Sequence, residues 1–224
     1  NIKTAMKSDV RTDKEVKRDR NRKPVETLKF FGIEDDMKVL ELIPGGGWYT
    51  KLLAPSLREK GSYSAALWTG NIKDNLIDKP GFDKIKLVNK EAVLTYNKEL
   101  KDYDIRDLNF GKNEYNAVLT FRNYHNFTED ARHKMNKASF NALKVGGVYG
   151  VVDHTMRHMQ EDNSENRRRF DPVLAIKEIE AAGFKFVDYS TLHYRADDEL
   201  RYEVGRKSVT GNSDRFTLLF KKVK

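Results

Sequence analysis

An apolar segment that runs into three consecutive glycines is the feature that most limits how this chain can fold. Residues 38–43 read Lys-Val-Leu-Glu-Leu-Ile, and residues 44–50 continue with Pro-Gly-Gly-Gly-Trp-Tyr-Thr. This pattern is typical of a strand followed by a tight turn into a helix. Glycine lacks a Cβ, so the backbone can adopt positive φ and approach a ligand that faces the free N–H groups of the helix. The sequence therefore predicts a site for a nucleotide-like ligand here, with Glu41 as a hydrogen-bond acceptor.

Strand-like and helix-like segments alternate along the rest of the chain. Six further apolar runs are typical of strands: 62–68, 85–88, 116–121, 148–153, 184–189 and 215–220. Helical patterns lie between several of them, which indicates a parallel sheet covered on both faces. Since no helical pattern separates the last two strands, we expect them to pair antiparallel. The expected fold is α/β, with a Rossmann-like, doubly wound, mostly parallel seven-stranded sheet and an antiparallel last strand.

Three helix ends carry specific expectations. Pro55 is expected to kink or end the helix after the glycines, because proline lacks the N–H that a helix interior requires. Thr128 is expected to cap a helix that ends at Gly146-Gly147, and Asp171-Pro172 to start another. Between residues 70 and 102 the sequence predicts only the short strand at 85–88.

Charge and length predict one domain with an N-terminal arm. The chain has 224 residues and a formal net charge of +8, and much of this excess lies in residues 1–23, where basic and acidic side chains alternate. Such mixed charge is typical of a solvated helix or arm. We therefore expect a basic N-terminal helical arm over residues 1–23 and a single domain over residues 24–224. The positive charge makes nucleic acid a possible partner.

Composition excludes several classes of protein. No apolar run is long enough to span a membrane, and the absence of cysteine excludes disulfides, thiolate nucleophiles and Cys-ligated zinc. The chain begins with Asn1 rather than methionine, so we expect that an N-terminal segment was removed, either an export signal or a segment lost by other processing. The sequence is compatible with an exported, periplasmic location and with a cytoplasmic one. It predicts no oligomeric state.

Five segments match a set of motifs in chain order. They are 39–47 (Val-Leu-Glu-Leu-Ile-Pro-Gly-Gly-Gly), 103–110 (Tyr-Asp-Ile-Arg-Asp-Leu-Asn-Phe), 116–121, 143–149 (Leu-Lys-Val-Gly-Gly-Val-Tyr) and 181–184 (Ala-Ala-Gly-Phe). Over about residues 24–222, they resemble class I S-adenosylmethionine-dependent methyltransferases. Segments 44–50, 121–126 and 152–154 also resemble a bacterial group of predicted methyltransferases that often carry export signals. Two features depart from the family pattern: Ile43 replaces the first glycine of the usual triplet, and segment 66–71 lacks the usual ribose-binding acid.

The resemblance implies S-adenosylmethionine as the cofactor. The glycines would cradle its methionyl part, Glu41 would hold its amine or a bridging water, and Asp104 would bind the adenine amine. Trp68 or Asn71 would cover the adenosine. The expected cofactor-binding residues are Glu41, Pro44, Gly45, Gly46, Gly47, Trp68, Asp104 and Asn123.

Polar side chains follow two strands at the edge where ligands bind in open parallel sheets. His125 is the first candidate for a general base, since an ordinary histidine pKa near 6.5 suits that role. His154 is the second candidate, and Arg122 would neutralise an acidic acceptor. A metal site at Asp153, His154 and His158 requires a helix after residue 154. The favoured interpretation is that Asp153 orients a neutral His154 and that no metal is bound.

The predicted function is methyl transfer by in-line displacement to an N, O or S nucleophile of a small molecule. An RNA methyltransferase and a non-catalytic adenosyl-binding domain are the alternatives. Arg167–Arg169 would either meet a phosphate or acidic substrate or, as the favoured interpretation, form a solvated basic triplet. The connection over residues 190–214 is predicted to be either a substrate lid or a surface insertion.

Overall fold

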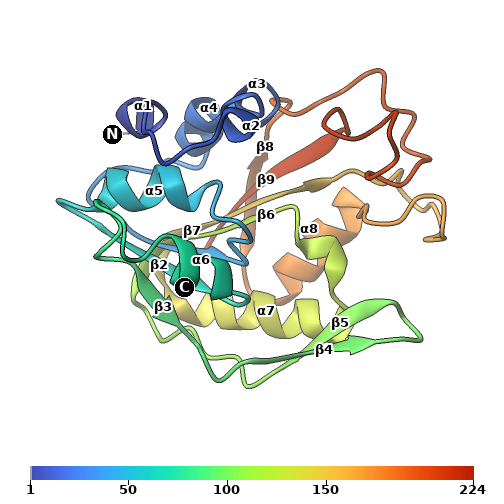
Figure 1. Cartoon of the computed structure of the whole chain (residues 1–224). Coiled ribbons are helices and arrows are strands. Elements are labelled where there is room, and N and C mark those ends of the chain that lie inside the picture. The colour runs from blue at the N-terminus through green and yellow to red at the C-terminus, as the bar shows by residue number, and fades with distance from the viewer. Residues whose placement is uncertain (1) are drawn as a thin grey trace.

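A seven-stranded sheet forms the centre of the computed structural model, which describes residues 2–224 (Figure 1). The strands are β1 (Lys38–Leu42), β2 (Ser62–Ala66), β3 (Lys86–Val88), β6 (Tyr115–Phe121), β7 (Leu143–His154), β8 (Lys185–Tyr189) and β9 (Arg215–Lys221). Their order is β3-β2-β1-β6-β7-β9-β8, and β9 runs antiparallel to both of its neighbours. The expected mostly parallel sheet with an antiparallel last strand is therefore confirmed.

Helices cover both faces of this sheet. They are α1 (Ile2–Ala5), α2 (Asp13–Val16), α3 (Asp19–Arg22), α4 (Pro24–Phe30), α5 (Thr50–Leu57), α6 (Gly70–Asn75), α7 (Glu129–Ala142) and α8 (Pro172–Ala181), with a short 3₁₀ turn η1 (Tyr124–Asn126). Alternate strand residues point to opposite faces. Val39 packs in the core beneath α5, and Leu40 packs in the second core beneath α7 and α8. Figure 1 shows α1–α5 on one side of the sheet and α7 on the other.

Helix starts follow the sequence more closely than helix ends. The Thr128 hydroxyl accepts from the Ala131 N–H, and the Asp171 carboxylate accepts from the Val173 N–H, as the capping patterns predict. The expected end of α7 at Gly146-Gly147 is wrong, because Leu143 turns to extended backbone and pairs with Tyr115. The two glycines lie within β7, where the register with β6 shifts.

Two local features also differ from expectation. Helix α5 continues through Pro55 to Leu57, since only the single Lys51 carbonyl loses a helical N–H partner. A hairpin of β4 (Val93–Asn97) and β5 (Asp102–Arg106) occupies a region where we expected no such element. Most of its side chains are partly or fully exposed, so its sequence lacks the strict alternation that identifies a half-buried strand.

The N-terminal arm packs against the domain rather than extending into solvent. Helix α1 lies against α5, and the Trp48 Nε1–H donates to the Glu15 carbonyl at 3.0 Å. The guanidinium groups of Arg11 and Arg22 lie over the Trp48 ring, at 5.2 and 4.3 Å from its centre. Both arginines are buried, so the expectation that the arm is solvated is wrong at these positions. None of the helices within residues 2–224 is long and apolar enough to cross a membrane.

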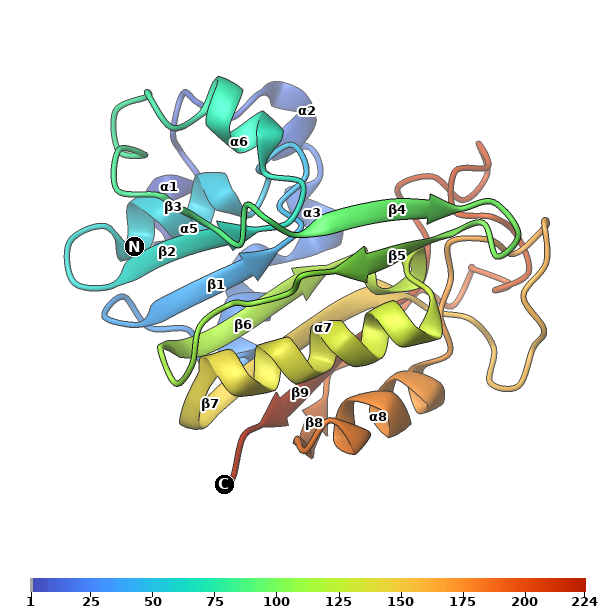
Figure 2. The same ribbon diagram turned by 90° about the horizontal axis from the view of Figure 1, so that it is seen from below.

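The connection over residues 190–214 forms no helix or strand but is held at several points. Arg169 is buried and makes a two-pronged ion pair with Asp198, at 2.8 and 2.9 Å. The Arg195 guanidinium donates to Asn21 of the arm at 3.1 Å. Figure 2 shows this connection at the end of the sheet toward which β1 and β6 point. Because Arg169 is buried and paired with Asp198, the expectation that Arg167–Arg169 is a solvated triplet is wrong at this residue.

Candidate functional site

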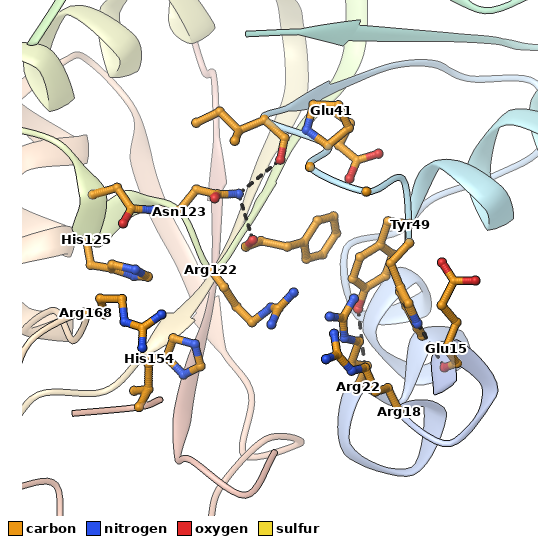
Figure 3. A pocket seen from close by; sticks show the side chains of 18 residues that line it. Glu15, Arg18, Arg22, Glu41, Tyr49, Arg122, Asn123, His125, His154 and Arg168 are labelled. Atoms are coloured by element: carbon orange, nitrogen blue, oxygen red, sulfur yellow. Dashed lines mark hydrogen bonds between the residues drawn. The ribbon is translucent and has the colours of Figure 1, made fainter. Parts of the chain in front are cut away.

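A cavity of about 350 Å³ lies at the carboxyl ends of β1 and β6 (Figure 3). These adjacent strands form the topological switch point, where the strand order reverses and ligands bind in doubly wound sheets. We call it the switch-point cavity. Its lining residues are Glu15, Arg18, Arg22, Glu41, Ile43, Pro44, Gly45, Gly46, Trp48, Tyr49, Phe121, Arg122, Asn123, His125, Asn126, His154, Arg168 and Val204.

The three glycines have different roles. A Cβ added to Gly45 or Gly46 would meet no other atom of the chain within 4 Å, and both glycines line the cavity. A Cβ on Gly47 would lie 2.6 Å from Leu76 Cδ1 and 2.9 Å from Ile72 Cδ1, and its φ is +79°. Gly47 therefore permits close packing against α6, whereas Gly45 and Gly46 leave an open backbone cradle.

Ile43 adopts the backbone conformation that a glycine at this position would favour. Its φ is +55°, a sparsely populated region for a β-branched residue. The Asn123 side-chain amide donates to the carbonyls of Ile43 and Phe121, at 3.1 and 2.9 Å, as Figure 3 shows. Asn123 thereby ties the ends of the two switch-point strands together. At the departure from the glycine triplet, Ile43 therefore holds a positive φ without being a glycine.

Glu41 is a buried acid at the side of the cradle. Its Oε2 accepts hydrogen bonds from the Tyr63 hydroxyl at 2.5 Å and the Thr50 hydroxyl at 3.1 Å. Burial raises the pKa of Glu41 to about 7, although these bonds and the charge of Arg22 act in the opposite direction. Among the residues that the structure describes, none donates to Oε1. This oxygen is therefore available to a ligand in the cavity.

His125 and Asp153 form a hydrogen-bonded pair. The fully buried Asp153 accepts from the His125 Nδ1–H at 2.7 Å and from the His125 backbone N–H at 2.9 Å. Protonation at Nδ1 leaves the lone pair of a neutral ring on Nε2. Because His125 lines the cavity, this pair is arranged to accept a proton there.

His154 has a different environment from the one expected. From His154, Asp153 accepts a hydrogen bond only from the backbone N–H, at 2.7 Å. The Nδ1 atom of the His154 ring lies 2.7 Å from the Ser213 hydroxyl. The expectation that Asp153 orients the His154 ring is therefore wrong. Burial and the charges of His125, Arg215 and Arg122 hold the pKa of His154 well below its ordinary value. His154 is thus a neutral group at neutral pH and a weaker base than an ordinary histidine.

The side chains weighed as metal ligands are separated. β7 ends at His154, so the helix that would align His154 with His158 does not form. The His158 ring instead contacts Asp171 at 2.8 Å. Within residues 2–224, no group of three or more histidine and acidic side chains is placed to hold a metal ion.

Trp68 and Asp104 lie apart from the cradle. Asp104 is in β5, where it accepts from the Thr128 hydroxyl at 2.7 Å and from Asn97 at 3.3 Å. Trp68 is 39% exposed and packs edge-on against Tyr103, with ring centres 4.7 Å apart. Neither residue lines the switch-point cavity. The adenosine contacts proposed for Trp68 and Asp104 stay predictions. The predicted site residues that do line the switch-point cavity are Glu41, Pro44, Gly45, Gly46, Arg122, Asn123, His125 and His154.

Several lining residues were not expected from the sequence. Tyr49 stacks on Phe121 with ring centres 3.6 Å apart, and Arg18 and Arg22 enter from the arm. Arg168 and Val204 come from the opposite side, where Arg168 pairs with Glu203. For Arg168 and Val204, substrate contact was one of the two alternatives that the sequence left open. For Arg18 and Arg22, the only signal was the density of arginine in the arm, because nothing local distinguishes a cavity-lining arginine from a solvated one.

Comparison with solved structures identifies the fold. A methyltransferase from Aquifex aeolicus, described as dependent on S-adenosylmethionine, is 16% identical with a TM-score of 0.64, over 92% of this chain and 93% of that chain. The CcbJ methyltransferase from Streptomyces caelestis is 12% identical with a TM-score of 0.57, over 92% and 90%. The [4+2]-cyclase SpnF is 13% identical with a TM-score of 0.60, over 90% and 80%.

The chain therefore has the Rossmann-like fold of S-adenosylmethionine-dependent methyltransferases. No protein-family model matches the sequence, and no curated protein matches it. The cyclase shares the same fold, so the reaction has to be argued from the site itself.

Proposed function

We propose that this protein transfers a methyl group from S-adenosylmethionine to a nucleophilic N, O or S atom of a small molecule. One observation carries the proposal: the open backbone at Gly45 and Gly46 faces the same cavity as the His125–Asp153 pair. The cradle would hold the donor, and the histidine would serve the acceptor. Both lie at the switch point of a methyltransferase fold.

The residues present fit the cofactor at its methionyl end. The free N–H groups and the missing Cβ atoms at Gly45 and Gly46 permit close approach of a ligand. Glu41 Oε1 is placed to accept from an amine, directly or through a water. Asp104 and Trp68 remain the proposed adenosine contacts.

The chain's own residues would position the reactants and accept a proton. When bound, S-adenosylmethionine supplies the methyl carbon, whose bond to sulfur breaks as the acceptor's lone pair forms the new bond, leaving the electron pair on sulfur. His125 Nε2 would take the acceptor's proton if the nucleophile carries one, and Asp153 would stabilise the resulting imidazolium. The stacked rings of Tyr49 and Phe121 line the cavity and would shield the reacting atoms from water.

Binding of the cofactor and its product tests the proposal. Calorimetric titration with S-adenosylmethionine and with S-adenosylhomocysteine should give one site with a Kd of about 1–100 μM. NADH is the matched control, because the same class of sheet also binds nicotinamide cofactors. A screen of metabolites with a labelled methyl donor then identifies the acceptor. Absence of binding of either adenosyl compound at millimolar concentration would refute the proposal.

A further inference from the structure

Four arginine side chains gather where the switch-point cavity adjoins a second cavity: Arg18, Arg22 and Arg122 line both, and Arg215 lines the second. Arg18 directly precedes α3, Arg22 ends it, Arg122 follows β6, and Arg215 begins β9. Figure 3 shows Arg122 extending between His154 and the wall that holds Arg18 and Arg22. Arg22 and Arg215 are only 5% and 7% exposed. We call these four residues the arginine cluster.

Arg22 and Arg215, the two buried members of the cluster, differ from the other buried arginines that the structure describes. Arg11, Arg132 and Arg169 are each paired with a carboxylate, at 2.5–2.8 Å, from Asp19, Glu178 and Asp198 respectively. Within residues 2–224, no carboxylate lies within ion-pair distance of any member of the cluster. Arg215 donates through Nη1 to the Asn21 carbonyl at 3.0 Å, while its buried Nε, like that of Arg11, has no hydrogen-bond partner in this part of the chain.

Nearby acids are engaged elsewhere and do not neutralise the cluster. Both carboxylate oxygens of Glu15 bind Lys51 at 2.9 Å, and Asp153 binds His125. Glu41 accepts from Tyr63 and Thr50, and its buried carboxyl has a raised pKa. The charge of Asp153 favours the ionised forms of Arg122 and Arg215, but within residues 2–224 no acid forms an ion pair with the cluster.

Such an arrangement is unfavourable unless an anion binds there. Burial and the mutual repulsion of the guanidinium groups lower the pKa values of Arg22, Arg122 and Arg215. Burying an unpaired charge costs free energy, and removing the repulsion requires negative charge between the groups. Planar guanidinium groups bind the oxygens of phosphates and carboxylates in two-pronged fashion.

We propose that the arginine cluster binds a phosphate or carboxylate group of the methyl acceptor. The inference rests on the proposed function, and it narrows the substrate to an anionic small molecule. S-adenosylmethionine brings a sulfonium and an ammonium together with its single carboxylate, so its binding would not offset the net positive charge of the cluster. Arg122 and His125 belong to one segment and line one cavity, so an acceptor anchored by the cluster lies within the space that His125 faces.

Anion titrations of the chain over residues 1–224 test this inference. Inorganic phosphate and malonate are titrated calorimetrically at constant ionic strength, with and without saturating S-adenosylhomocysteine. We expect at least one anion to bind one site, and the stronger of the two identifies phosphate or carboxylate chemistry. Arg122→Gln and Arg18→Gln should each weaken that binding about tenfold, as expected for lost charge-assisted hydrogen bonds.

The variants are chosen so that misfolding does not obscure the result. Arg18 is exposed, so its substitution preserves the core, and Arg20→Gln in α3 is the matched control because Arg20 does not line the cavity. The control should change anion binding by less than about twofold. Arg122→Gln should also leave S-adenosylhomocysteine affinity within about twofold, since the cluster is assigned to the acceptor.

Four results would overturn the inference. The first is the absence of anion binding, and the second is a loss of anion binding in Arg20→Gln equal to that in Arg18→Gln. The third is a loss of S-adenosylhomocysteine binding in Arg122→Gln that parallels the loss of anion binding. The fourth is binding of single-stranded RNA that is stronger than anion binding and falls steeply with salt. The third would assign the cluster to the cofactor carboxylate, and the fourth would assign the site to a polymer. Failure of S-adenosylhomocysteine to bind the unmodified chain is a separate outcome, which refutes methyl transfer itself.

Discussion

Two buried carboxylates define the chemistry of the site at the scale of single residues. Glu41 and Asp153 sit at the ends of β1 and β7, and both are nearly or fully shielded from solvent. Asp153 has three N–H donors, whereas Glu41 has two hydroxyl donors on one oxygen and none on the other within residues 2–224. Buried carboxylates thus serve two roles here. Asp153 fixes the orientation of His125, and Glu41 leaves its Oε1 atom free to accept a hydrogen bond from a ligand, at a cost in stability.

Glu41→Gln should remove a pH dependence of stability. The pKa of Glu41 is about 7 in the folded chain, against an ordinary value of 4.5. Between these values the folded chain holds a proton that the unfolded chain has released, so the free energy of unfolding falls as pH rises from about 4.5 to about 7. The loss amounts to roughly 3 kcal/mol at most. Urea unfolding at pH 5 and pH 8, without ligand, measures this difference.

The glutamine variant should therefore be the more stable protein at pH 8 and should bind S-adenosylmethionine more weakly. Glu199→Gln is the control, because the Glu199 side chain is 65% exposed. Equal pH dependence in the wild type and Glu41→Gln would contradict the assignment.

Asp153→Asn should change the protonation pattern of His125. The carboxylate accepts from His125 Nδ1–H, and an amide group in its place can donate to Nδ1 instead, which moves the ring proton to Nε2. Nitrogen-15 NMR of the imidazole distinguishes the two forms. Turnover should fall about 10²-fold or more once an acceptor is identified.

The same substitution at Asp171, which contacts the exposed His158, is the matched control. It should leave the His125 signals unchanged. An unaltered Nδ1–H form in Asp153→Asn would mean that the carboxylate does not set the tautomer.

At the scale of elements, the glycine turn combines a packing function with a binding function. Gly47 allows α6 to approach the turn, and Gly46 faces the cavity with no atom of the chain near its missing Cβ. Ile43 carries the preceding bend at positive φ and contributes to the core. Adjacent residues of one turn are therefore constrained by different neighbours.

Gly46→Ala and Gly47→Ala should separate these functions. Gly46→Ala should leave stability within about 0.5 kcal/mol but weaken S-adenosylhomocysteine binding about tenfold or more, because its methyl group projects into the cradle. Gly47→Ala should destabilise the fold by about 1–3 kcal/mol, through its φ of +79° and its contacts with Leu76 and Ile72. Urea unfolding and calorimetric titration of both variants make the comparison. Tight binding by Gly46→Ala would show that the ligand does not use the cradle.

At the scale of the whole molecule, segments distant in sequence enclose one cavity. The arm contributes Glu15, Arg18 and Arg22, and the 190–214 connection contributes Val204. The two segments also contact each other through Asn21 and Arg195. A site closed in this way requires that the arm fold together with the sheet.

The arm should therefore unfold in the same transition as the domain. The chain has two tryptophans, and Trp48 contacts Glu15 and Arg22 of the arm. In Trp68→Phe, the fluorescence of Trp48 should change at the same denaturant concentration as far-UV circular dichroism, as a two-state transition requires. Trp48→Phe, which retains the exposed Trp68, is the control. An earlier change at Trp48 would mean that the arm unfolds independently.

Much of the fold could be predicted because its determinants are local. Apolar periodicity identified the seven central strands, and the caps at Thr128 and Asp171 follow from hydrogen bonds within a few residues. The hairpin at 93–106 was missed, since its exposed strands carry no burial pattern. The end of α7 was misplaced because β-pairing of Leu143 with Tyr115, a distant partner, overrode the local stop signal.

The sequence by itself determined the class of sheet, the glycine turn and the polar residues at the strand ends, because each depends on neighbours along the chain. Only the tertiary structure decided that Asp153 binds His125 rather than the ring of His154, and that Arg22 lines the same cavity as Arg122. These relations depend on side-chain direction and on how distant segments pack. A linear pattern does not encode them, because the same arginine is solvated or buried according to what the rest of the chain places beside it.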